Sequence, residues 1–403
     1  MKRLLIVLGT VILGCGGSTG SENCTVEAVE AGALMRCPGQ EDLLIESSTP
    51  GADCFALARE EGDQLICDDG RQVTLPAPLP DVSCTVTLSN DLAVVQCDGE
   101  EPFTVAPLPS CDALVGTFTV RNDRELRALA QLKCPRIEGS LLIQGLTTES
   151  LEGLEALEEV TGRLQIEDNL RLQSLQGLSG LRTVGRLDVA RNHGLSSLEG
   201  LEGLESARTL SLQNNRGLAA LVDFSALTHL ENLEISFNPL LTEIAGFEGI
   251  HEISGTVLLG GMAEPDGFVA LPGLQNLERV GAFHLRTNRL MDLSDLAALQ
   301  EVERELILSN GMELTSLAGL EGLERIGGML MIWVNPQLES MEALQGVETF
   351  GDAWEPVTFN PYRLRVESNP SLPACQAQAF AAVHEVPEEE RLIQGNDEEA
   401  LCE

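Results

Sequence analysis

Hydrophobic residues in the second half of the chain recur with a period of 23 residues. Triplets of two apolar residues around a variable one begin at Leu141, Leu164, Leu187, Leu210 and Leu233, and looser copies at Val257, Phe283, Leu306, Leu330 and Leu364. Each triplet predicts a short strand whose outer two residues point inward and whose middle residue points outward. Leucine- and glutamate-rich runs between the triplets predict a return path with leucine inside and glutamate in water. Because one coil cannot bury its own apolar side, the pattern predicts a β-solenoid of about ten stacked turns.

Asparagine follows the predicted strands in the same phase. The strict copies are Asn169, Asn192, Asn215 and Asn238, and the looser ones are Asn288, Asn335 and Asn369. An asparagine side chain can hydrogen-bond to backbone groups of the adjacent coils, because it carries both donors and acceptors. We therefore predict a ladder of asparagines along one edge of the solenoid.

The repeat resembles two related families of solenoid. Val184, Leu187, Val189 and Asn192 match the leucine-rich-repeat pattern LxxLxLxxN. Residues 185–207, with a glycine before the strand, resemble more closely the receptor L domain of insulin- and growth-factor-receptor ectodomains, and residues 134–145 resemble its first coil. The resemblance runs from Cys111 to the C-terminus. It implies a right-handed coil that binds a ligand, but no receptor binding residue can be assigned to a position here.

The first twenty residues have the features of an export signal. Lys2 and Arg3 precede an apolar run, residues 4–13, that is too short to span a bilayer. The run ends in Ile-Leu-Gly before Cys15, which resembles a bacterial lipobox. The resemblance implies that residues 1–14 are a signal peptide, that Cys15 carries lipid and that residues 15–23 are a tether. The alternative is an ordinary secretory signal with an incidental Cys15.

Both alternatives predict export, and the resemblance to a lipobox implies anchoring in the bacterial cell envelope. Gly16 follows the cysteine, and by resemblance to enterobacterial lipoproteins the absence of Asp there favours the outer membrane. A multiply acylated Cys15 would anchor the protein to the membrane, at about 0.8 kcal/mol per buried methylene.

Eleven cysteines leave ten once Cys15 is set aside, and an even set in an exported protein predicts disulfides. The candidate pairs, in chain order, are Cys24 with Cys37, Cys54 with Cys67, Cys84 with Cys97, Cys111 with Cys134, and Cys375 with Cys402. The first three pairs define a threefold repeat over residues 24–110, each unit a small disulfide-paired set of strands, which resembles the stalk repeats of bacterial surface lipoproteins. A zinc site is the alternative, but no CxxC occurs and no histidine precedes His193. The last two pairs flank the predicted caps at the two ends of the solenoid. The solenoid with its caps is expected to span residues 111–403.

Composition argues against several functions. Lys+Arg 25 against Asp+Glu 63 gives a net charge of −38, which argues against nucleic acid as a partner. The five histidines form no catalytic or metal-binding motif, so we expect no enzyme activity, no cofactor and no metal. A carbohydrate-active β-solenoid enzyme is the alternative, although the outward strand residues hold no charged trio in register. A purely structural envelope protein is a third possibility.

The outward positions suggest a binding face. They are polar in the first half of the array, whereas later ones are apolar, and the candidate binding residues are Leu258, His284, Ile307, Met331 and Trp333. An exposed apolar patch often marks a partner site. The alternative is that the aromatic-rich insertion at residues 349–362 folds over them; a second insertion, residues 260–273, is a candidate binding loop. We therefore expect a lipid-anchored, non-catalytic protein whose solenoid recognises a protein or glycan.

Overall fold

The computed structural model describes residues 111–261, 269–354 and 361–400, together with the backbone of short strands between residues 5 and 105. The chain divides into two compact units, Met1–Gln165 and Ile166–Glu403. Within the described residues, no helix has both the length and the apolar character needed to cross a membrane.

The strands before residue 111 form three antiparallel sheets. Two sheets have three strands each, β3 (Thr25–Val29), β4 (Gly32–Arg36), β5 (Leu43–Glu46) and β6 (Cys54–Leu57), β7 (Gln64–Cys67), β8 (Gln72–Thr74). The third has five, β1 (Leu5–Val7), β2 (Thr10–Leu13), β9 (Cys84–Ser89), β10 (Leu92–Cys97) and β11 (Phe103–Val105). The register places Cys54 opposite Cys67 and Cys84 opposite Cys97. The side chains of the cysteines from Cys15 to Cys97 lie outside the described residues.

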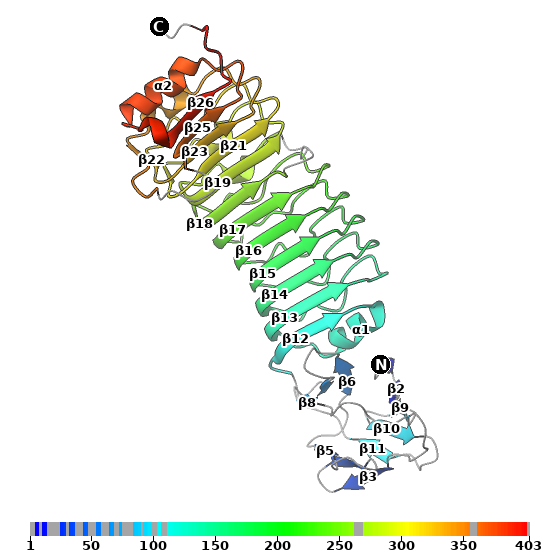
Figure 1. Cartoon of the computed structure of the whole chain (residues 1–403). Coiled ribbons are helices and arrows are strands. Elements are labelled where there is room, and N and C mark those ends of the chain that lie inside the picture. The colour runs from blue at the N-terminus through cyan, green and yellow to red at the C-terminus, as the bar shows by residue number, and fades with distance from the viewer. Residues whose placement is uncertain are drawn as a thin grey trace, which may run out of the picture. The chain divides into compact units, whose positions relative to one another are not determined.

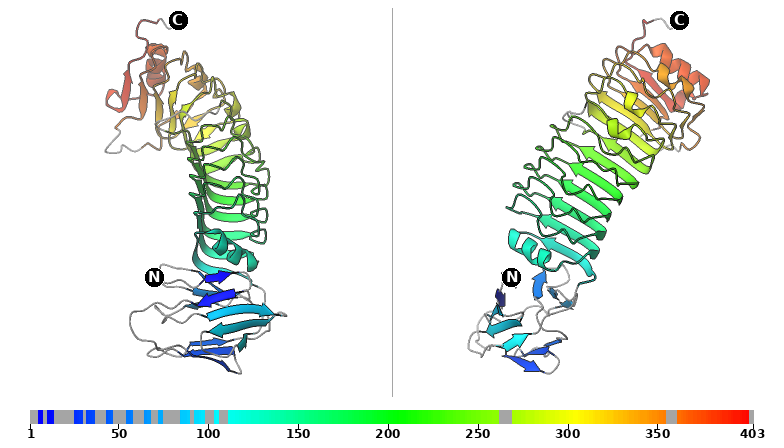
Figure 2. Two further views of the ribbon diagram at one scale, coloured as in Figure 1. Left: turned by 90° about the vertical axis from the view of Figure 1, so that its right-hand side faces the viewer. Right: turned by 180° about the vertical axis from the view of Figure 1, so that it is seen from behind.

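The rest of the chain is built on one sheet of 15 parallel strands. Its main path is β12 (Leu114–Val120), β13 (Arg136–Gln144), β14 (Glu159–Glu167), β15 (Thr183–Ala190), β16 (Ser206–Gln213), β17 (His229–Ser236), β18 (Glu252–Leu259), β19 (Arg279–Asn288), β21 (Leu306–Gly311), β23 (Leu330–Trp333), β25 (Leu364–Glu367) and β26 (Arg391–Gln394). Three two-residue strands lie beside this path, β20 (Glu301–Val302), β22 (Arg325–Ile326) and β24 (Thr349–Phe350). The ten triplets all lie in strands of the main path. In the second unit the strands stack side by side from β15 to β26 (Figure 1), and the segments between them return along the opposite side (Figure 2).

The core follows from the alternation within each coil. In β15 the side chains of Leu187 and Val189 are fully buried, and so are Leu198, Leu201 and Leu204 of the return segment. The return segments include three short 3-10 helices, η1 (Pro272–Leu274), η2 (Ser294–Leu296) and η3 (Glu342–Gly346). Each buried leucine contributes roughly 1.5–3 kcal/mol, so every coil of the regular repeat adds a similar stabilisation.

The asparagine ladder is confirmed where the period is strict. The backbone N–H of Asn169 donates to Oδ1 of Asn192, that of Asn192 to Asn215, and that of Asn215 to Asn238, each at 3.0 Å. The Nδ2 atom of Asn215 also donates to the Val189 carbonyl at 2.9 Å, so this one side chain links two neighbouring coils. All four asparagines are fully buried, so the ladder satisfies backbone groups that water cannot reach.

The ladder is interrupted once and then resumes. No asparagine occurs in residues 257–275, and Asn288 accepts instead from Leu290 N–H of its own coil at 3.0 Å. The ladder begins again where Gly311 N–H donates to Oδ1 of Asn335 at 2.9 Å. It then continues through Asn335, Asn369 and Asn396 at 2.9 and 3.2 Å, so Asn396 is a member that the sequence pattern did not reveal. Residues 262–268 of the second insertion lie outside the described residues.

The residue just before each ladder position has a left-handed backbone. This φ is 57° at Asp168, 55° at Asn214, 56° at Asn310 and 55° at Val334. Asparagine and aspartate tolerate the conformation, but a β-branched valine adopts it only at a cost of roughly 1–3 kcal/mol.

We expect Val334→Asn to raise the free energy of unfolding by about 1 kcal/mol, because it relieves this strain while leaving the backbone hydrogen bond from Val334 N–H to Glu367 O in place. Urea denaturation measures the change. The reverse exchange at the equivalent position, Asn310→Val, should lower stability by a similar amount, and a gain in both variants would contradict the explanation.

Both predicted caps contain a helix. At the first end, α1 (Asp123–Gln131) begins after Asn122, whose side-chain oxygen accepts from the N–H groups of Arg124 and Glu125 at 3.1 and 3.0 Å. The Cys111–Cys134 disulfide that brackets this cap is confirmed. At the other end, α2 (Ala374–Val383) leads through η4 (Glu388–Glu390) into β26. Cys375 is disulfide-bonded, and Cys402 lies outside the described residues.

Candidate functional site

The sheet register places four of the five predicted binding residues in one row. Leu258 lies beside His284, His284 beside Ile307, and Ile307 beside Met331 on successive strands. Arg365 of β25 extends the row beyond Met331. Neighbouring rungs are about 4.8 Å apart. Trp333, the fifth residue, lies two positions after Met331 on β23, between Ser309 and Glu367. We call Leu258, His284, Ile307, Met331 and Trp333 the apolar row.

The apolar row is less exposed than its outward position suggests. Ile307 is 8% exposed, and the other four members are half-buried. Side chains on adjacent rungs cover one another, and an isoleucine between His284 and Met331 is therefore largely shielded from water. The face nonetheless retains accessible apolar and aromatic surface at four of five positions.

One aromatic residue of the insertion, Phe350, packs away from the apolar row. Phe350 is 7% exposed and its ring contacts Phe380 of α2 and His384, with centroid distances of 5.2 and 5.6 Å. This aromatic residue therefore belongs to the C-terminal cap and not to a cover over the row. Residues 355–360, including Phe359, lie outside the described residues.

The earlier, polar part of the same face is internally paired. Nε of Arg186 donates to both carboxylate oxygens of Asp188 at 2.8 and 2.9 Å. On the next two strands, the Ser211 hydroxyl donates to Glu234 at 3.2 Å. These polar side chains use their hydrogen-bonding groups on each other, so they have less to offer a partner.

Charges border the apolar row. Nε2 of His284 faces Oε2 of Glu305 at 3.8 Å. The imidazole lowers the pKa of the Glu305 carboxyl below its ordinary value, against partial burial, which acts to raise it. At the other end, the Arg365 guanidinium lies over the Trp333 ring, 5.3 Å from its centroid, and forms an ion pair with Glu367. The row thus combines apolar side chains, an indole and a few fixed charges.

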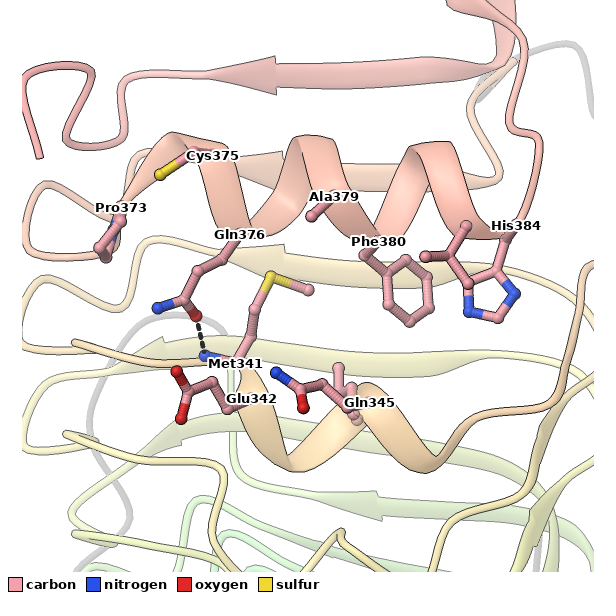
Figure 3. A pocket seen from close by; sticks show the side chains of 11 residues that line it. Met341, Glu342, Gln345, Pro373, Cys375, Gln376, Ala379, Phe380 and His384 are labelled. Carbon is pink, nitrogen blue, oxygen red and sulfur yellow. Dashed lines mark hydrogen bonds between the residues drawn. The ribbon is translucent and has the colours of Figure 1, made fainter. Parts of the chain in front are cut away.

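A second candidate site lies at the C-terminal cap, where the sequence predicted none. It is a groove of about 540 Å³ between η3 and α2 (Figure 3). Its lining residues are Met341, Glu342, Leu344, Gln345, Pro373, Cys375, Gln376, Ala379, Phe380, Val383 and His384. The side chain of Gln376 closes one end by accepting from Met341 N–H at 2.8 Å.

His384 closes the other end of the groove. Its ring lies 4.3 Å from the Phe380 ring, measured between centroids. Burial lowers the pKa of the His384 imidazole, and the nearby Arg363 guanidinium lowers it further, so the ring is neutral at pH 7. The neutral imidazole packs with the rings of Phe350 and Phe380, and the Arg363 guanidinium lies over the Phe350 ring, 5.8 Å from its centroid.

This shift predicts a pH dependence of stability. A depressed histidine pKa means that the unfolded chain binds the proton more tightly, so the contribution is complete above about pH 6.5, the unfolded value, and is lost as the pH falls below it. We expect the melting temperature of the parent protein to fall between pH 7 and pH 5.5 by more than that of His384→Gln. Thermal melting followed by circular dichroism tests this, and parallel curves for the two proteins would contradict it.

The described residues do not suggest a metal site. They contain no group of three or more His, Cys, Asp or Glu residues placed to hold a metal ion. The sequence predicted the apolar row because its residues recur at the same position of successive repeats. It did not predict the groove, because η3 and α2 do not follow the repeat.

Comparison with known proteins supports one part of the fold. Residues 133–218 match the Receptor L domain family, over 86 of 403 residues or about a fifth of the chain. The matched stretch contains β13 to β16, where the 23-residue period is strict. No curated protein matches the chain.

Proposed function

We propose that this protein is a non-catalytic recognition lipoprotein of the bacterial cell envelope, in which the outer sheet face of the solenoid binds a protein or glycan partner. The supporting observation is the change along that face from paired polar rungs, such as Arg186 with Asp188, to the apolar row. Clustered apolar and aromatic groups with a few charges are typical of the centre of a recognition surface.

The rest of the chain fits this role as a support. In the proposal the solenoid is a right-handed coil of about ten turns with a 23-residue period, lipid on Cys15 anchors it, and the β units of residues 24–110 act as a disulfide-paired stalk. Mass spectrometry of the mature N-terminal peptide tests the anchor. Lipid on Cys15 is expected in the parent protein, and Cys15→Ser should leave the precursor uncleaved; a mature chain that begins elsewhere would contradict the anchor but not the recognition face.

Site-specific photocrosslinking in cells tests the recognition face. A photoreactive amino acid at position 331 or 333 of the full chain is expected to give a discrete adduct, which protease or glycan staining then assigns to a class. The matched control is position 291, because Met291 is 63% exposed but lies outside the row. Adducts of equal size and yield at positions 291 and 331 would overturn the proposal, as would their absence at 331 and 333.

The half-buried positions of the row call for a second readout. Met331→Gln with Trp333→Ala should abolish the adduct captured from a probe at position 258 while leaving the melting temperature within a few degrees of the parent. If the purified full chain degraded an envelope polysaccharide instead, the enzyme interpretation would replace this one.

A further inference from the structure

The groove between η3 and α2 has the features of a binding site separate from the apolar row. Helix α2 contains ten residues and no charged side chain, in a protein of which 22% of residues are charged. Its outer face presents Ala379, Ala382 and Val383 to water, and Val383 is 75% exposed. An uncharged helix at the surface of so acidic a protein presents apolar area to water among the described residues.

The floor of the groove continues this apolar surface inward. Met341, Leu344 and Phe380 line it and are 3%, 1% and 8% exposed. Figure 3 shows the side chains of Met341 and Phe380 between η3 and α2. The volume of about 540 Å³ lies within the range of known ligand sites. A helix of ten residues is about 15 Å long, which is long enough to cover the roughly 10 Å between positions i and i+7 of a second helix.

The charge of the lining residues predicts the charge of the segment that would bind. Glu342 is its one carboxylate, no lysine or arginine is among the lining residues, and His384 at the far end is neutral at pH 7. The net charge of the chain is −38, so the surrounding field also attracts cations. The groove is therefore complementary to a segment that is apolar on one face and carries a basic side chain beside it.

We propose that this groove binds a basic amphipathic helix of a partner protein. Apolar side chains of that helix pack on Met341, Phe380 and Val383, and a lysine or arginine pairs with Glu342. This site does not depend on the apolar row or on its proposed ligand.

The probe is a fluorescein-labelled amphipathic peptide of leucine and lysine, about 18 residues long, titrated with the full chain and followed by fluorescence anisotropy at physiological salt. A peptide of the same composition in scrambled order keeps the charge but loses the apolar face, so it reports general attraction to an acidic protein. We expect the amphipathic peptide to bind at least tenfold more tightly than the scrambled one. Equal binding of the two peptides would overturn the proposal.

Matched variants assign the binding to the groove. Ala379→Gln with Val383→Gln leaves the net charge unchanged at exposed positions and should weaken binding of the amphipathic peptide about tenfold. Met291→Gln removes a comparable exposed side chain elsewhere and should leave binding unchanged. Glu342→Gln should weaken binding about threefold and reduce its salt dependence. Unchanged binding by the double variant would contradict the site, and so would dimerisation of the free chain that the double variant abolishes.

Discussion

Replacing Asn215 by alanine is expected to lower the free energy of unfolding by about 2–5 kcal/mol. The substitution removes two hydrogen-bond partners at once, because Oδ1 of Asn215 accepts from Asn192 N–H and its Nδ2 donates to the Val189 carbonyl. Both backbone groups lie in a fully buried edge, and each costs roughly 1–3 kcal/mol when it is left without a partner. Urea denaturation followed by circular dichroism measures the loss.

The neighbouring residue is a close control for this prediction. Asn214 is exposed and has a φ of 55°, a conformation that glycine adopts without strain. Asn214→Gly should therefore change stability by less than about 0.5 kcal/mol. If the two variants behaved alike, the ladder would not be the source of the stabilisation.

The second large effect is expected at Gly200. This residue has a φ of 109°, and a Cβ built on it would lie 2.3 Å from the Leu175 carbonyl oxygen of the preceding coil. Because the obstacle is backbone, the two coils would have to separate, and the conformation itself is unfavourable for any other residue. We expect Gly200→Ala to cost about 2–4 kcal/mol and to lower the melting temperature by several degrees.

Gly203, three residues later, provides the contrast. A Cβ there would meet Nη1 of Arg182 at 2.1 Å and the Ser179 carbonyl oxygen at 3.2 Å. The Arg182 guanidinium, which donates to the Gly203 carbonyl, is the end of a long side chain and can move, and the backbone contact needs only a small shift. Gly203→Ala should therefore cost less than about 1 kcal/mol. Calorimetric melting of both variants tests the pair, and equal losses would refute the explanation from the backbone clash.

The strict repeat made much of the second unit predictable. Each coil repeats the same spacing of buried leucine and asparagine, so the positions of Leu187, Val189 and Asn192 in a strand and its turn follow from periodicity alone. The resemblance to the receptor L domain, placed on residues 185–207, agrees with the family match at residues 133–218. Asn396 escaped this reasoning because helix α2 separates it from Asn369, and a helix carries no trace of the 23-residue period.

The groove could not be predicted for a related reason. Met341 and Phe380 come from different coils of irregular length, and only the folding of the C-terminal cap brings them to one surface. The exposure of the apolar row was also beyond the sequence, since alternation predicts which way Ile307 points but not that His284 and Met331 cover it. The period of the sequence predicts whether a side chain points inward or outward within its coil. The side chains on adjacent coils then determine how much of it is exposed to water.

The interruption of the asparagine ladder divides the second unit into two hydrogen-bonded zippers. The first runs from Asn169 to Asn238 and the second from Gly311 to Asn396. Because each coil of a solenoid is stabilised by its nearest neighbours, cooperativity along the array is weakest where the coupling between neighbours is weakest. The coils around Gly261 and Asn288 lie between the two zippers, and there β17, β18 and β19 remain paired as parallel strands, so the sheet itself couples the two blocks across the extra residues.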